Sequence, residues 1–272
     1  MYRAEVHALS ARQGETDATW ESQKGSGTKI EHSHDVHFSS AAFTRLMLDP
    51  RFITVCTAII GPNVQLHHNK IFIKPPEKGS PFPMHQDYPY FPHRDHSMIS
   101  AIFHFDDTPV EKGCLCVYPG GHKLAPLDAI GSDHHLPEDR FPFAGATPIP
   151  AKAGDVVFFH YLLPHGSGQN VSDEPRTTLL VQLRDPADVP LNNDRTAFWS
   201  ARNRADQKSR LESKAGLDPE GPRHRVGRID AAVGADRSPV QDCVVLKVFD
   251  VSLNREAIVG CNVGEPKIGL GV

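Results

Sequence analysis

The sequence predicts a mainly β protein, either a barrel or a jelly roll with flanking helices. Short segments of alternating polar and apolar residues recur through the middle of the chain, and turns rich in Gly and Pro separate them. Helical periodicity is clear only before this region. The 272 residues are 39% hydrophobic and include 23 Pro and 21 Gly, which is typical of a loop-rich globular protein and not of a helical bundle.

An amphipathic helix is expected first, because apolar residues recur at helical spacing over 52–60 and Gly61-Pro62 then supplies a stop. The strands predicted after it are 64–74, 98–105, 114–118, 156–161 and 177–183. In the first strand, alternation divides the side chains between two faces. One face carries Leu66, His68, Lys70, Phe72 and Lys74, and the other carries His67, Asn69, Ile71 and Ile73.

We expect one core with additions at both ends. Residues 1–38 are polar and include the flexible-looking run Gly25-Ser26-Gly27, so they are predicted to be an N-terminal arm that contributes little to the core. Residues 39–190 are predicted to form the β core together with its packing helix.

Residues 191–272 are predicted to be a C-terminal extension. Its charged segment, 202–237, is either a solvated face or a lid, and apolar runs at 244–249 and 258–263 predict two late strands.

Charge and hydropathy favour a small-molecule partner. The formal net charge of −4 provides no strong field that would attract nucleic acid or an anionic membrane. The longest apolar runs fall far short of the ~20 residues that a spanning helix needs, and residues 1–20 lack an apolar signal core. The five cysteines are odd in number and scattered, which favours reduced thiols and a cytoplasmic location. The sequence makes no prediction of oligomeric state.

The strongest local signal for chemistry is Pro83-Met84-His85-Gln86-Asp87. A His and a carboxylate two residues apart on a strand point to the same face and can share a metal ion. His165 follows an apolar strand and a turn, and it is the candidate third ligand. Two His and one carboxylate form the facial triad of non-haem iron enzymes, which leaves three positions of Fe(II) open.

Arg176 suggests an anion site beside this metal. It opens the apolar strand 177–183, where a lone guanidinium needs an anionic partner. A 2-oxo acid that chelates the metal would direct its distal carboxylate inward, and arginine is suited to bind a carboxylate with two parallel hydrogen bonds. Thr178, on the same strand face, could add a hydroxyl contact.

These motifs together resemble the phytanoyl-CoA dioxygenase family, which includes ectoine hydroxylase. The resemblance covers roughly residues 40–186 and rests on the segments His85-Gln86-Asp87, Glu111-Lys112-Gly113-Cys114-Leu115, Pro119-Gly120-Gly121-His122 and His165-Gly166-Ser167, followed by Arg176. The chain differs from the usual family pattern at Gly121, where Ser is common, and the usual N-terminal helices are expected to be short or missing.

The resemblance implies a double-stranded β-helix (jelly-roll) core with His85, Asp87 and His165 as iron ligands. It also implies Arg176 as the anchor for 2-oxoglutarate, with a contribution from Ser167. Lys70 is added as a further candidate on the strand face that also carries His68, although a core or surface position fits Lys70 as well.

The implied activity is that of an Fe(II)- and 2-oxoglutarate-dependent dioxygenase. Such an enzyme uses dioxygen to hydroxylate an unactivated C–H bond of a small metabolite and releases succinate and carbon dioxide, with ascorbate as a supporting reductant. Desaturation, ring formation and epimerisation use the same kind of iron centre and stay open. Two other classes also stay open: a cupin-like metalloenzyme that does not use 2-oxoglutarate, and a non-enzymatic jelly-roll module that binds a ligand.

Other histidines are given structural interpretations. His104 and Asp106 are a second pair two residues apart, but they end a long strand and are expected to be structural. His32, His34 and His37 lie in a polar segment and are expected to be solvated. His67 and His68 are expected to lie on opposite strand faces and not to interact. The aromatic residues Tyr88, Tyr90 and Phe91 either line the bottom of a substrate site or only cover the barrel.

Overall fold

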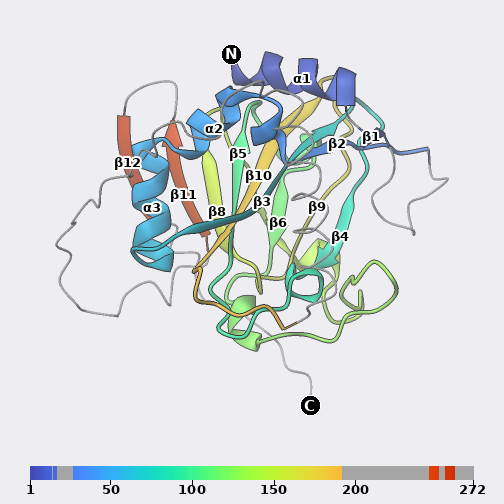
Figure 1. Ribbon diagram of the computed structural model, residues 1–272. Coiled ribbons are helices and arrows are strands. Elements are labelled where there is room, and N and C mark those ends of the chain that lie inside the picture. Colours follow the sequence, from blue (N-terminus) through green and yellow to red (C-terminus); the bar gives the residue numbers. More distant parts are fainter. Residues whose placement is uncertain (14, 17–26, 192–244, 251–254, 261–272) are drawn as a thin grey trace, which may run out of the picture.

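Two antiparallel β-sheets form the body of the protein in the computed structural model, which describes residues 1–13, 15–16, 27–191, 245–250 and 255–260 (Figure 1). The larger, eight-stranded sheet has the order β1 (Glu15–Thr16), β2 (Glu31–His34), β3 (Gln65–Lys74), β10 (Arg176–Arg184), β5 (Ile99–His104), β8 (Val156–His160), β11 (Val245–Asp250) and β12 (Arg255–Gly260). The smaller sheet has the order β4 (Phe82–His85), β9 (His165–Ser167), β6 (Leu115–Val117) and β7 (Thr147–Ile149). This arrangement confirms the predicted jelly roll with flanking helices.

The strands with clear alternation match their predicted positions closely. These are β3, β5, β6, β8 and β10. The strands β7 and β9 were not predicted, because each has only three residues and neither Thr-Pro-Ile nor His-Gly-Ser shows a strand pattern.

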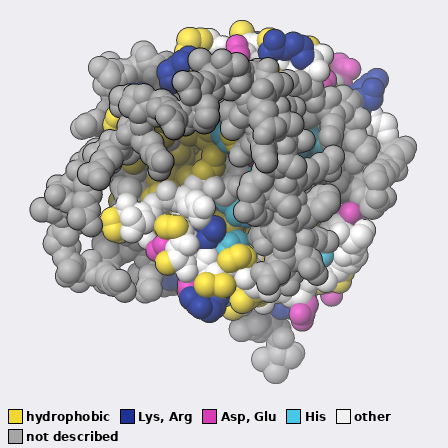
Figure 2. All heavy atoms as spheres, viewed as in Figure 1, with side chains coloured by type: hydrophobic (Ala, Val, Ile, Leu, Met, Phe, Trp, Pro, Cys, Tyr) yellow, Lys and Arg dark blue, Asp and Glu magenta, His cyan; other side chains and the backbone are white. Residues whose placement is uncertain are grey.

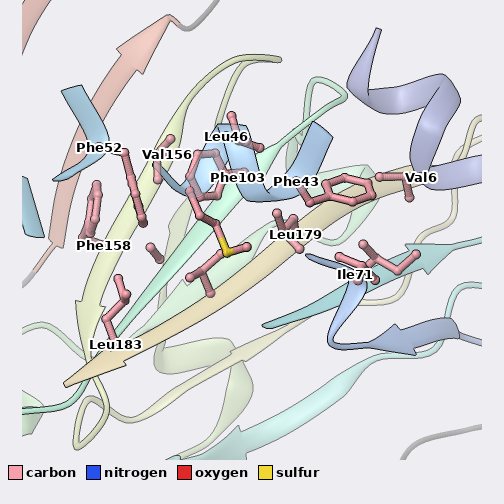
Figure 3. Close-up of a cluster of buried hydrophobic side chains, with 14 of the residues drawn as sticks. Val6, Phe43, Leu46, Phe52, Ile71, Phe103, Val156, Phe158, Leu179 and Leu183 are labelled. Atoms are coloured by element: carbon pink, nitrogen blue, oxygen red, sulfur yellow. The ribbon is translucent and has the colours of Figure 1, made fainter. Parts of the chain in front are cut away.

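In the described part of the chain, three α-helices flank the larger sheet: α1 (Tyr2–Gln13), α2 (Ala41–Met47) and α3 (Pro50–Ile60). Helix α3 begins at the Asp49 cap, whose carboxylate accepts a hydrogen bond from the Arg51 backbone N–H, and Pro50 occupies the first turn. Figure 3 shows Phe52 of α3 beside Phe103 and Phe158 of the sheet, and their ring centroids lie 4.9 and 5.6 Å from that of Phe52. The helices therefore support the sheet from its outer face.

The N-terminal segment belongs to this core. Val6 and Leu9 of α1 are fully buried with the side chains of α2, α3 and the sheet. Strand β2 pairs with β3, and Ile30 and Val36 are also fully buried. The prediction that residues 1–38 contribute little to the core is therefore wrong for residues 1–13 and 27–38. The expectation of short or missing N-terminal helices is wrong for α1. Its two buried apolar side chains, Val6 and Leu9, anchor a helix that has no continuous apolar stripe.

Alternation along β10 separates the core from the space between the sheets. Leu179, Val181 and Leu183 pack among the outer-face side chains under the helices. The alternate positions, Arg176, Thr178, Leu180 and Gln182, line a cavity between the two sheets. One strand thus contributes both to the core and to the wall of the cavity.

The C-terminal extension contributes β11, which pairs with β8, and β12, which pairs with β11. Strand β11 lies close to the first predicted late strand, 244–249, whereas β12 overlaps the second, 258–263, only at residues 258–260. The candidate lid segment, 202–237, lies outside the described residues. The division of the chain at residues 38 and 190 stays a prediction.

Side chains of Lys, Arg, Asp and Glu are interspersed over the outer parts of the face shown in Figure 2. Among the described residues, no helix combines the length and the apolar character that a bilayer-crossing helix requires.

Burial of α1 leads to a stability prediction. Leu9 is 0% exposed, and Leu48, just after α2, is 66% exposed. We expect Leu9→Ala to lower the free energy of unfolding by about 2–5 kcal/mol, because it leaves a cavity in the core. Leu48→Ala should change the free energy of unfolding by less than about 0.5 kcal/mol. Urea unfolding of both variants measures this difference, and equal effects would contradict the packing of α1 against the sheet.

Candidate active site

Pairing of β4 with β9 places two candidate metal ligands side by side. In this antiparallel pair, His85 lies directly opposite His165, and the imidazole centroids are 4.2 Å apart. Gly166 permits this close approach, because a Cβ atom at that position would lie 2.7 Å from the carbonyl oxygen of Phe82. Residues far apart in the sequence thus meet through backbone pairing.

Asp87 completes the cluster from just beyond the end of β4. The sequence analysis places it on a strand with His85, but β4 ends at His85 and Asp87 has helical backbone angles before a short 3-10 turn, Tyr88–Tyr90. A hydrogen bond of 2.9 Å from the Asp87 N–H to the Tyr161 carbonyl holds this turn. Asp87 Oδ1 lies 3.7 Å from Nε2 of both histidines.

The hydrogen bonds of both imidazoles suit them to bind a metal. Nδ1 of His85 donates to the Pro83 carbonyl and Nδ1 of His165 donates to the Leu163 carbonyl, both at 2.8 Å. Since a carbonyl only accepts, Nδ1 carries the proton in each ring and Nε2 keeps its lone pair toward Asp87. Burial, and then His165, hold the pKa of His85 well below its usual value, which favours the neutral ligand form. The three candidate ligand atoms lie within 4.8 Å of one another.

Two residues that the sequence analysis missed orient the Asp87 carboxylate. Its Oδ2 accepts hydrogen bonds from Ser100 Oγ at 2.8 Å and from Gln182 Nε2 at 2.7 Å. Gln182 Nε2 also donates to Ser100 Oγ at 3.0 Å. Oδ2 is thereby occupied, and Oδ1 is left to face the histidines. The only sequence signal was the presence of polar residues within the buried strands β5 and β10.

One cavity of ≈ 400 Å³ brings together all seven residues that the sequence analysis selects. They are His85, Asp87, His165, Ser167, Arg176, Thr178 and Lys70. Tyr90 and Phe91 also line this cavity, whereas Tyr88 packs against Tyr161 with a ring separation of 5.8 Å. The cavity is therefore lined by apolar and aromatic walls with a few convergent polar groups, as is common in small-molecule sites.

Arg176 gives one end of the cavity a positive charge. The side chain is buried, and the guanidinium donates to the Gly113 carbonyl. Burial lowers the pKa of Arg176 to about 10, which leaves the group protonated at neutral pH. Ser167 lines the same cavity, and its hydroxyl contacts the buried Lys74, a residue to which the sequence analysis assigned no role.

The structure corrects two expectations about other histidines. His32 is buried and His34 lines the cavity, so they are not solvated as expected, because pairing of β2 with β3 covers this segment. His67 and His68 do interact, with their Nδ1 atoms 2.8 Å apart. A register shift of β3 against β10 leaves His67 without a pairing partner and locally changes the direction of the side chains.

His104 and Asp106 do not form a second metal site with a third ligand among the described residues. His104 is hydrogen-bonded to Thr108, and Asp106 accepts the Thr177 N–H. Both contacts fit the expected structural role.

A family profile, phytanoyl-CoA dioxygenase (PhyH), matches residues 1–178, well over half of the chain. The chain belongs to the phytanoyl-CoA dioxygenase family. This PhyH-family chain is 36% identical over 141 residues to the peroxisomal phytanoyl-CoA dioxygenase of Mus musculus. That match covers 46% of this chain and 41% of the mouse protein, so the chain aligns with about two fifths of its mammalian relative.

Another relative of this PhyH-family chain is the ectoine dioxygenase of Nocardia farcinica, which is 26% identical over 202 residues. The match covers 66% of this chain and 67% of the relative. Among solved structures, the epimerase SnoN in complex with Fe3+, alpha ketoglutarate and nogalamycin RO superimposes with a TM-score of 0.58 at 26% identity. This superposition covers 71% of this chain and 86% of the epimerase.

The hydrogen bonds to Asp87 generate a prediction on metal affinity. We expect Gln182→Leu to weaken binding of Fe(II), or of Mn(II) as a stable substitute, by about 10- to 100-fold, because Asp87 loses a partner that orients it. Gln169→Leu is the matched control, since Gln169 is exposed. Calorimetric titration measures both affinities. An unchanged affinity in Gln182→Leu would show that the carboxylate needs no such support.

Proposed function

We propose that this PhyH-family chain is an Fe(II)- and 2-oxoglutarate-dependent dioxygenase that hydroxylates an unactivated C–H bond of a small metabolite. The observation that carries the proposal is a single cavity with a His-Asp-His cluster and a buried arginine. The dioxygenase names of the curated relatives support it. A related epimerase that binds Fe3+ and alpha ketoglutarate supports the choice of both cofactors.

The donor set fits iron. His85, Asp87 and His165 would hold Fe(II) through two neutral imidazole nitrogens and one carboxylate oxygen, which leaves other positions of the metal open. When bound, the iron supplies the redox chemistry that couples oxidation of 2-oxoglutarate and substrate to reduction of dioxygen. The protein's part is to keep both Nε2 lone pairs and Asp87 Oδ1 facing one point through the backbone and side-chain hydrogen bonds described above.

The arginine end fits the co-substrate. We propose that the guanidinium of Arg176 binds the distal carboxylate of 2-oxoglutarate, with hydroxyl donors from Ser167 and Thr178 beside it. Lys70 lines the same cavity and is proposed as a further contact. Its backbone pairs with that of Leu180, four residues along β10 from Arg176, so Lys70 would lie closer to the metal end.

The substrate is proposed to enter past Tyr90 and Phe91, whose rings line the cavity on the chain segment that follows Asp87. Apolar walls there would exclude water from the reacting carbon. In the balanced reaction, substrate, 2-oxoglutarate and dioxygen give hydroxylated product, succinate and carbon dioxide. Ascorbate is proposed to support turnover by keeping the iron reduced, and a cytoplasmic location stays a prediction.

The test is succinate formation by purified protein supplied with Fe(II), ascorbate and 2-oxoglutarate, in the presence of a library of candidate metabolites. We expect succinate that depends on metal and rises with a true substrate, and no succinate from His165→Ala. A non-enzymatic binding module would form none above the metal-free control, which would overturn the proposal.

A second variant separates the proposal from a cupin-like enzyme. Arg176→Ala should weaken 2-oxoglutarate binding by about 30-fold or more, because it removes a buried charged partner of the carboxylate. An enzyme that does not use 2-oxoglutarate would keep most of its activity in this variant. Initial rates against 2-oxoglutarate concentration distinguish these outcomes.

A further inference from the structure

We propose that Lys74 is a positioning residue for the distal carboxylate of the co-substrate: its ammonium group holds the Ser167 oxygen so that the hydroxyl proton is available to the anion bound by Arg176. Lys74 would thereby make the site selective for a 2-oxo acid with a second carboxylate. The inference rests on the proposed function and extends it to a residue that does not line the cavity.

The first observation is that two cations are buried at paired positions. Lys74, the last residue of β3, lies directly opposite Arg176, the first residue of β10. Their side chains are 0% and 6% exposed. Like charges at directly opposite strand positions are destabilising. In agreement, burial and then the nearby Arg176 hold the pKa of Lys74 well below its usual value.

The second observation concerns the partners of these cations. Lys74 Nζ donates to Ser167 Oγ at 2.7 Å and to the Gly168 carbonyl, and Arg176 donates to the Gly113 carbonyl. Within the part of the chain that the structure describes, neither cation forms an ion pair with a carboxylate. Two buried positive charges without an ion-paired carboxylate are costly unless an anion joins them. The acidic side chains nearby are the thiols of Cys114 and Cys116.

The third observation is the direction of the hydrogen bond. An ammonium group only donates, so Ser167 Oγ accepts from Lys74 through a lone pair. The single hydroxyl proton of Ser167 must therefore point elsewhere. Ser167 and Arg176 both line the cavity, so this proton and the guanidinium can both be offered to a carboxylate.

The backbone of Lys74 is held firmly enough for such a role. The amide of the buried Asn170 donates to the carbonyls of Lys74 and Pro75, both at 3.1 Å, and to that of Glu174 at 2.8 Å. These bonds tie the end of β3 to the segment just before Arg176. The distance between the two cations is thus set by the fold and not by flexible side chains alone.

The test compares two ligands that differ in the distal carboxylate. 2-Oxoglutarate and 2-oxopentanoate are titrated calorimetrically, without oxygen, into the full chain loaded with Mn(II). In Lys74→Met, we expect 2-oxoglutarate to bind about 10- to 100-fold more weakly and 2-oxopentanoate to bind as in the wild type. Lys152→Met, which replaces an exposed lysine, is the matched control and should change neither affinity.

Ser167→Ala and the double variant show whether Lys74 acts through Ser167. We expect the effects on 2-oxoglutarate affinity to be less than additive, because each variant breaks the same hydrogen-bonded unit. Thermal unfolding without ligands checks that the variants fold. If Lys74→Met does not fold, Lys74→Gln replaces it in the same titrations.

The outcomes separate the two proposals. The role of Lys74 would be overturned if a folded Lys74 variant bound both ligands more weakly by the same factor, or bound 2-oxoglutarate as tightly as the wild type. Either result would leave the proposed function intact. Failure of the metal-loaded wild type to bind either 2-oxo acid would overturn both.

Discussion

The antiparallel pairing of β4 with β9 is the contact on which the candidate site depends. It sets His85 opposite His165, and a glycine between His165 and Ser167 lets the two backbones approach. Each imidazole is then locked by a hydrogen bond to the carbonyl two residues before it. Because these bonds are made by the backbone, the orientation of both Nε2 lone pairs is a property of the fold, and only Asp87 relies on side chains for its orientation.

The larger sheet supplies those side chains and also stabilises the site from behind. Along β10, one face packs into the helix-covered core, while the other places Arg176 near one end of the cavity and Gln182 beside Asp87. A change that shifted β10 by one residue would exchange these faces, moving leucines into the cavity and polar groups into the core. Core packing and site geometry are therefore set by the same register.

Much of this arrangement could be predicted from sequence. The long alternating strands follow from a period of two, and the candidate metal ligands follow from a motif of two His and one Asp, which are common metal-binding residues. Residues that act only through other side chains are hard to identify from sequence. Ser100 and Gln182 are isolated polar residues in apolar strands, and Lys74 is one of several residues on an alternating strand face. Their roles depend on hydrogen bonds between distant segments, which no local pattern encodes.

The helix α1 was missed for a related reason, since Val6 and Leu9, its two buried apolar residues, are too few to produce a clear helical stripe. They are core residues because they pack with side chains of α2, α3 and the sheet, and this contact exists only in the assembled fold.

Charge distribution links the two ends of the cavity. The metal end combines one carboxylate with two imidazoles, which suits a divalent cation. At the opposite end Arg176 lines the cavity with Lys74 paired behind it, and among the described residues neither forms an ion pair with a carboxylate. A dianionic ligand that chelates a bound metal at one end and reaches Arg176 at the other would offset positive charge at both ends of the cavity. Binding of metal and of dicarboxylate should then reinforce each other, because the bound metal attracts the dianion and the dianion offsets the positive charge that the metal adds. In this way the electrostatic cost of burying Lys74 opposite Arg176 would become part of the affinity for the proposed co-substrate.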